Sequence, residues 1–168
     1  MRGITFSEFA GGKNVDMFLH APDTLPGTPM QEAVKTAITI REKYTKDIYV
    51  WCDYSVQHMY SQLAMQAFKM ANIDFTAAIP VLSNNLSKRE NDCSIAYCES
   101  RNIPYELFYI DVPELFNGPR FEYWGQHFPT TQPQMTIVGR FFDLLPDCCL
   151  VYPGFMMHVS NSEWTRSK

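Results

Sequence analysis

Asp47-Ile48-Tyr49-Val50-Trp51-Cys52 is a short run, rich in β-branched and aromatic residues, that is too compact for a helix. Its nearly continuous apolar character is typical of a strand covered on both faces. Similar runs occupy residues 75–82 and 106–112, and stretches with helical periodicity separate the three. Strands that alternate with helices of about 10–15 residues indicate βαβ units. The sequence therefore predicts an α/β fold: a Rossmann-like three-layer α/β/α sandwich with a mostly parallel sheet.

Two local patterns predict where helices begin. Thr28, Pro29 and Gln31 match an N-cap, a first-turn proline and a capping box. Ser87 and Glu90 match a second capping box. After the first pattern, apolar residues that we expect to face the core recur at helical spacing: Met30, Ala33, Val34, Ala37 and Ile38. Further helices are predicted for residues 59–72 and 134–145, and a last strand for residues 148–152.

The length of the chain and the positions of its Gly- and Pro-rich runs predict a single domain. The chain has 168 residues, which suits one ordinary core. Residues 1–29 show no sustained period and end in a Pro- and Gly-bearing run, so we expect an irregular lead-in before an α/β core at 30–154 and a tail at 155–168. The Gly-Gly-Lys at 11–13 precedes no strand-to-helix unit of the kind that binds phosphate, and we interpret it as a turn. Residues 117–133 are aromatic and interrupted by Gly and Pro, which favours a long loop.

Composition excludes several classes of function. The chain carries 14 Lys and Arg against 18 Asp and Glu, a net charge of -4, which disfavours non-specific binding to nucleic acid. No window approaches the roughly 18 consecutive apolar residues of a membrane span, and the N-terminus lacks the apolar stretch of a signal peptide. We therefore expect a soluble, intracellular protein. Its five cysteines form no C-x-x-C pair and are expected to be reduced and mostly buried.

The loop after the first strand is the first place to look for a site, because ligands of open parallel sheets bind outside the carboxyl ends of the strands. This loop, residues 53–58, reads DYSVQH, and no glycine occurs between Thr28 and Asn117. A phosphate cradle needs glycines for close approach of the backbone, so neither a Walker A loop nor a G-x-G-x-x-G fingerprint is present. Four polar side chains could either bind a small ligand or cap the next helix: Asp53, Ser55, Gln57 and His58. No catalytic residue is assigned.

Several short blocks of sequence carry a family resemblance. They are the strand 48–52, then Asn85, Asn91-Asp92, Ala96 and Cys98, then Asn102-Ile103 and Ile110-Asp111, and finally Gln132-Pro133-Gln134 and Tyr152-Pro153-Gly154. Through these blocks, the stretch from Ile48 to about Gly154 resembles the PP-loop family. These adenine nucleotide alpha hydrolases include ATP pyrophosphatases and phosphoadenosine phosphosulfate reductases, and the resemblance is greatest to small phage-encoded members.

The resemblance implies a function as well as a fold. It implies that ATP binds with its pyrophosphate on the loop after the first strand, that Mg²⁺ assists, and that a substrate is adenylated by attack at the alpha phosphorus. Asp92 and Asp111 are carboxylates that could hold Mg²⁺, although Asp92 equally suits the dipole of a helix. The candidate nucleotide-binding residues are Asp53, Tyr54, Ser55, Gln57, His58, Ser61, Asn91, Asp92 and Asp111.

The sequence departs from the family at its phosphate loop. Residues 53–58 or, in the other register, 56–61 replace the S-G-G-x-D-S motif, and both glycines are gone. Side chains there would fill the volume that a pyrophosphate needs. The first hypothesis is therefore a degenerate, non-catalytic PP-loop-like phage protein, a binding or structural component located in the cytoplasm of an infected cell or in the virion. Aromatic residues at 121–124 and Trp164 would anchor a protein partner or a homo-oligomer.

The alternative hypothesis keeps the nucleotide. In that case the protein is an enzyme of the ATP pyrophosphatase type that adenylates a substrate. Side chains would then replace backbone amides as ligands of the adenine nucleotide: Asp53, Ser55, Gln57, His58 and Ser61. The sequence alone leaves both hypotheses open.

Overall fold

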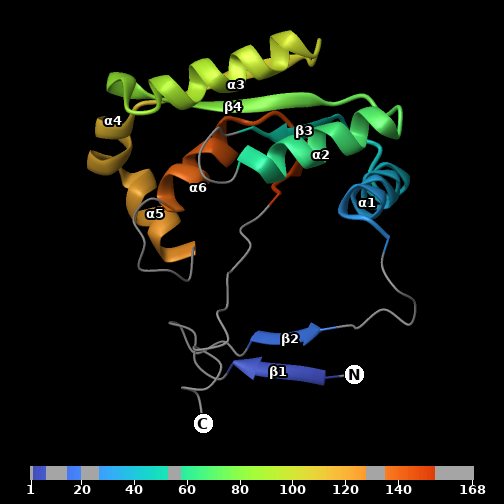
Figure 1. Ribbon diagram of the computed structural model, residues 1–168. Helices are drawn as coiled ribbons and strands as arrows, with labels where there is room; N and C mark the ends of the chain where they lie inside the picture. The colour runs from blue at the N-terminus through green and yellow to red at the C-terminus, as the bar shows by residue number, and fades with distance from the viewer. Residues whose placement is uncertain (1, 7–14, 20–26, 53–57, 128–134, 154–168) are drawn as a thin grey trace, which may run out of the picture.

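The computed structural model describes residues 2–6, 15–19, 27–52, 58–127 and 135–153 of the chain (Figure 1). Strands and helices alternate through most of this length. In chain order they are β1 (Arg2–Phe6), β2 (Val15–Leu19), α1 (Pro29–Lys43), β3 (Ile48–Trp51), α2 (His58–Met70), β4 (Thr76–Leu82), a 3-10 turn at Ser83–Asn85, α3 (Lys88–Ser100), β5 (Tyr105–Ile110), α4 (Val112–Asn117), α5 (Pro119–His127), α6 (Met135–Leu144) and β6 (Cys149–Val151).

Four strands form one parallel sheet in the order β5-β4-β3-β6. Val50 of β3 lies opposite Ala77 of β4 on one side and Val151 of β6 on the other. The β4–β5 pairing is the longest and runs from Ala77 opposite Tyr105 to Leu82 opposite Ile110. This sheet, with helices on both faces, confirms the predicted Rossmann-like α/β sandwich.

The two faces of the sheet carry separate cores because side chains alternate along each strand. Ile48 and Val50 of β3 point toward α1, α2 and α3, where they join a cluster that includes Met65 and Phe68 of α2. Trp51 points to the other face and packs in a cluster with residues of β5, α4 and α6. Figure 1 shows α3 running alongside β4, and α4, α5 and α6 lying together as one group of helices.

The predicted start of α1 is confirmed. The Gln31 backbone N–H donates to the Thr28 hydroxyl at 3.3 Å, and the Thr28 N–H donates to the Gln31 side-chain oxygen at 2.8 Å. These reciprocal bonds satisfy amide groups that the first helical turn leaves free. The expected inward stripe is wrong at Ile38, whose side chain is 42 % exposed.

Pro80 is accommodated inside the central strand β4. The Ala77 N–H donates to the Pro104 carbonyl on the β5 side, and Ala78 accepts a bond from Cys52 on the β3 side. Because backbone groups alternate sides along a strand, the N–H that Pro80 lacks would face β3. The pairing of β3 with β4 ends at Ala78, so Pro80 removes no backbone hydrogen bond between these two strands.

The predicted long loop at 117–133 is wrong for its first part, which forms α5. Gly118 separates α4 from α5, and Pro119 fixes the backbone angle of the first turn of α5. The helix is held by packing: the indole ring of Trp124 lies against the backbone of Gly139 in α6. Residues 128–134 lie outside the described residues.

Two further expectations are corrected. Residues 1–29 are not irregular throughout, because β1 and β2 pair antiparallel with Ile4 opposite Met17. Each strand is only five residues long, too short to show a period beside the Gly- and Pro-bearing segments. The Gly-Gly-Lys that we interpreted as a turn lies outside the described residues. Ser87 does not cap α3 with its side chain, so the second capping box is wrong.

Candidate functional site

The candidate functional site lies where the order of the strands reverses. From β3 the chain adds β4 and β5 on one side, and then returns to place β6 on the other side of β3. Open α/β sheets bind ligands outside the carboxyl ends of the strands that flank such a switch point. Here those ends are Trp51-Cys52 and Val151-Tyr152.

Trp51 fills the sheet side of this switch point. Its ring meets Phe141 edge-on at 4.4 Å between centroids and Tyr152 at 5.2 Å, and only 6 % of the residue is exposed. Among the described residues, the indole Nε1–H has no hydrogen-bond partner. Leaving a buried donor without a partner costs about 1–3 kcal/mol of stability, so a hydrogen-bond acceptor that reached this N–H would stabilise the protein.

Cys52 closes the other side of the same strand end. Its N–H donates to the Ala78 carbonyl at 2.9 Å, and its side chain is buried beside Cys98 of α3. A hydrogen bond from Cys52 lowers the pKa of the Cys98 thiol, against the opposing effect of burial. The five cysteines form no disulfide with one another, and the expectation that they are mostly buried is wrong for three that are only half-buried: Cys93, Cys148 and Cys149. The two buried thiols belong to the core of the α1–α3 face.

The carboxyl end of β4 is held by serine hydroxyls. Ser87 accepts a bond from the Leu82 N–H at 3.1 Å and another from the Asn91 side-chain amide at 2.9 Å. Ser83 accepts a bond from the Val112 N–H at 3.0 Å, which ties the ends of β4 and β5 together. These groups therefore fix the chain between the strands and the helices that follow.

The described nucleotide candidates have local structural roles. Asp111 accepts a bond from the Glu114 N–H at 2.9 Å and is the N-cap of α4. Asn91 donates to Ser87, as above, and Asp92 pairs with Lys88 at 3.1 Å on the exposed face of α3. Ser61 is buried in α2.

The remaining candidates are in the loop after β3. Four of them lie outside the described residues: Asp53, Tyr54, Ser55 and Gln57. His58 is the first residue of α2, and its side chain is also outside the described part. The end of β3, which precedes this loop, lies at the switch point between β4 and β6, and α2 begins directly after the loop.

The candidate side chains described at the carboxyl ends of the strands make hydrogen bonds within the fold. Asp111 already caps a helix, and the Asn91 amide is already bonded to a serine. Within the described residues, no group of three or more His, Cys, Asp or Glu side chains is placed to hold a metal ion.

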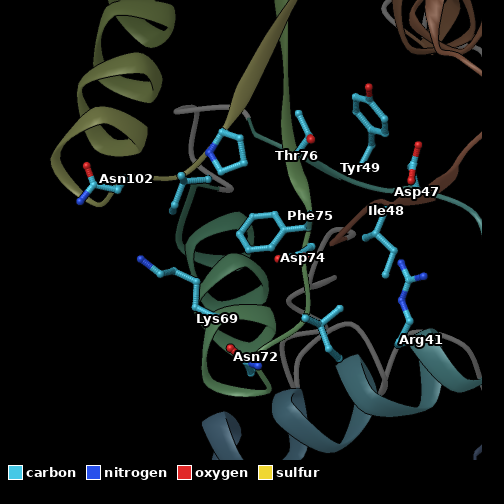
Figure 2. Close-up of a pocket in the computed structure, with 13 residues that line it drawn as sticks. Arg41, Asp47, Ile48, Tyr49, Lys69, Asn72, Asp74, Phe75, Thr76 and Asn102 are labelled. Carbon is cyan, nitrogen blue, oxygen red and sulfur yellow. The ribbon is translucent and has the colours of Figure 1, made fainter.

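A pocket that the sequence did not indicate lies at the opposite edge of the sheet, beside the amino ends of the strands (Figure 2). It has a volume of about 770 Å³. Asn72 and Asn102 adopt left-handed backbone angles, with φ of 53° and 51°, in the turns that end α2 and α3. An Asn-Ile pair follows each helix, and asparagine at this position is a helix-termination signal that sequence reading could have used.

The basic groups of this pocket bond to the main chain. Lys69 donates to the Arg101 carbonyl at 2.7 Å, and Arg41 donates to the Lys46 carbonyl at 3.1 Å. Both cations therefore satisfy carbonyl oxygens at chain turns, including one just beyond the end of α3. The two bonds join α2 to the turn after α3, and α1 to the segment before β3.

Of the aromatic residues at 121–124 that were predicted to anchor a partner, some pack within the fold and one is exposed. Phe121 stacks on Phe116 at 4.8 Å, and Trp124 Nε1–H donates to Asp143 at 3.1 Å. Tyr123 is exposed, with the Arg120 guanidinium 4.4 Å above its ring. Trp164, the other predicted anchor, lies outside the described residues.

Arg120 and Asp143 join α5 to α6. The guanidinium donates two hydrogen bonds to the carboxylate, one of them 2.8 Å from Nε to Oδ2. Burial opposes ionisation of Asp143, but the bonds from Arg120 and Trp124 outweigh it and lower the pKa of the carboxyl below its ordinary value. Asp143 thus stays ionised beneath the aromatic segment.

No protein-family model and no curated protein matches the chain. The described helices include none that is both long enough and apolar enough to cross a membrane.

Proposed function

We propose that this protein is a non-catalytic binding or structural component built on a degenerate PP-loop-like fold, of phage origin and present in the infected cell or the virion. One observation carries the proposal. The described side chains that would serve a nucleotide are engaged in the fold, since Asp111 caps α4, Asn91 bonds to Ser87 and Asp92 pairs with Lys88.

The sequence of the switch-point region supports the same view. No glycine lies between Thr28 and Asn117, so every residue from α1 to α4 carries a Cβ. Backbone amides can surround a phosphate closely only where side chains leave room. Adenylation would need such a cradle at the start of α2.

Exposed aromatic residues support a binding role. Phe116, Tyr123 and Phe142 of the α4–α6 face all have substantial exposed area, and Arg120 lies over the Tyr123 ring. Tyrosine and arginine are enriched among residues that dominate the energy of protein interfaces. A protein partner would bury these rings without any change in the sheet.

Thermal unfolding with and without ATP and Mg²⁺ tests the absence of nucleotide binding. A ligand that binds only the folded state raises the unfolding midpoint, so we expect the same midpoint with Mg²⁺ alone and with millimolar ATP plus Mg²⁺. A rise that Ser55→Ala or Gln57→Ala removes would contradict the proposal and favour the adenine-nucleotide enzyme.

Quantification of the protein in purified virions tests the structural role. We expect it to remain with the particles after washing at high salt, in a fixed number per particle. For a binding role outside the virion, Tyr123→Ala should weaken association with a purified partner, whereas Tyr44→Ala, an exposed ring on the opposite face, should not. Loss of the protein from particles together with no effect of Tyr123→Ala would contradict both roles.

A further inference from the structure

Strand β5 is an edge of the sheet and pairs only with β4 among the described residues. The bond from the Ala77 N–H to the Pro104 carbonyl shows which β5 groups face inward. Because backbone groups alternate sides along a strand, the groups of Tyr105, Leu107 and Tyr109 face away from the sheet. Three consecutive outward-facing positions thus present both an N–H and a C=O.

The edge lacks the features that usually protect such strands. Natural edges carry lysine, proline or a bulge that discourages further pairing, and Tyr105–Ile110 contains none of the three. Its one charged residue, Glu106, accepts a hydrogen bond from the Tyr49 hydroxyl at 2.9 Å, which draws the carboxylate over its own sheet. Tyr109 is 69 % exposed, so the described chain leaves the outer end of the strand open.

We infer that β5 pairs antiparallel with β5 of a second copy and joins two sheets into one continuous sheet. This inference is independent of the proposed function. The strand is self-complementary about Leu107, because that register places Leu107 opposite itself and Tyr105 opposite Tyr109 of the second copy. Each outward-facing residue then forms both backbone bonds with its opposite residue.

Side chains and charge fit the same register. Facing tyrosines on one side of the sheet give aromatic cross-strand pairs, which stabilise antiparallel strands. On the other side Glu106 lies opposite Phe108 of the second copy, so the two carboxylates do not face each other directly. A strand of another sequence would need residues that pair with the tyrosines and avoid Glu106 in the same way, whereas a second copy of β5 already has them.

The mass of the protein in solution tests the inference. Light scattering coupled to size exclusion should give twice the chain mass of 19.4 kDa as concentration rises from micromolar toward millimolar. Tyr109→Pro removes an outward N–H without touching the β4–β5 ladder, and should give a monomer at all these concentrations. Tyr109→Ala keeps the N–H and should weaken the dimer less than Tyr109→Pro does.

Two further variants keep the test decisive if the proline variant fails to fold. Tyr109→Lys introduces the charge that protected edges carry and should also give a monomer. Met70→Lys makes the same change at a 58 % exposed methionine at the end of α2, and should leave the dimer intact. A monomeric wild-type protein would overturn the inference, and so would a dimer that persists in Tyr109→Lys.

Hydrogen exchange distinguishes this edge from any other interface. In the dimer, the amides of Tyr105, Leu107 and Tyr109 should exchange more slowly at high than at low concentration. Unchanged exchange at these three amides in a dimeric protein would place the contact elsewhere and overturn the inference.

Discussion

The Tyr49 hydroxyl on β3 donates a hydrogen bond to the Glu106 carboxylate on β5 at 2.9 Å, passing over the intervening strand β4. This contact is possible because β4 carries small residues there, with Ala78 opposite Glu106. The hydrogen bond to Glu106, with burial and the negative charge of Glu106, raises the pKa of Tyr49 to about 12.

This relationship predicts a loss of stability in alkali. The folded state favours neutral Tyr49, so the contribution is present below the ordinary pKa of 10 and is lost as pH rises from there through about 12. Denaturant unfolding should show a free energy that falls over this window. In Tyr49→Phe the fall should be smaller, and an equal fall in both proteins would contradict the prediction.

The ionised Asp143 predicts the opposite dependence at low pH. Because its pKa is lowered in the folded protein, its contribution is present above the ordinary carboxyl pKa and is lost as pH falls below it. Asp143→Asn should lower the thermal midpoint near neutral pH and have less effect in acid. Asp92→Asn, at an exposed pair on α3, serves as the control and should change little.

Because Trp124 packs on Gly139, we predict that a larger residue at position 139 destabilises the protein. A Cβ at Gly139 would overlap the indole ring, so Gly139→Ala should lower the free energy of unfolding by about 1–3 kcal/mol. Gly125 of α5 has open space around its Cα, and Gly125→Ala should be neutral or stabilise by up to about 1 kcal/mol. Equal effects of the two changes would show that α5 and α6 do not pack as described.

The capping box of α1 predicts a modest loss of stability when Thr28 is replaced. Thr28→Ala removes the acceptor of the Gln31 N–H, and should lower the free energy of unfolding by about 1 kcal/mol. Thr28→Ser keeps an acceptor and should retain most of the free energy of unfolding that Thr28→Ala loses. Chemical denaturation of the three proteins measures both effects.

The features predicted correctly are those that depend on neighbouring residues. The run from Ile48 to Trp51 and the Thr28 cap carry their signals within a few positions, and the parallel sheet follows from the alternation of strands and helices. Residues 87–90 also match a local pattern. There the Ser87 hydroxyl binds the N–H of Leu82 instead, a competition that the pattern does not reveal.

The features that were missed depend on contacts between distant residues. Helix α5 is held by Trp124 against Gly139 and by Arg120 with Asp143, and neither pairing is visible in the segment 117–133. Of the candidate site, the sequence predicted the strands after which the candidate residues lie, since β3 ends at Trp51 and β5 at Ile110. It could not foresee that Asp111 and Asn91 are occupied by hydrogen bonds within the fold.

The position of β6 beside β3 also governs the order in which the protein can be completed. Synthesis proceeds from the N-terminus, and domains fold as their segments emerge. Strand β3 can pair with β4 early, but its other side and the ring of Trp51 wait for α6 and for Cys149–Val151. A nascent chain therefore exposes one unpaired side of β3 and the ring of Trp51 until Tyr152 has been synthesised, an interval in which both could promote aggregation.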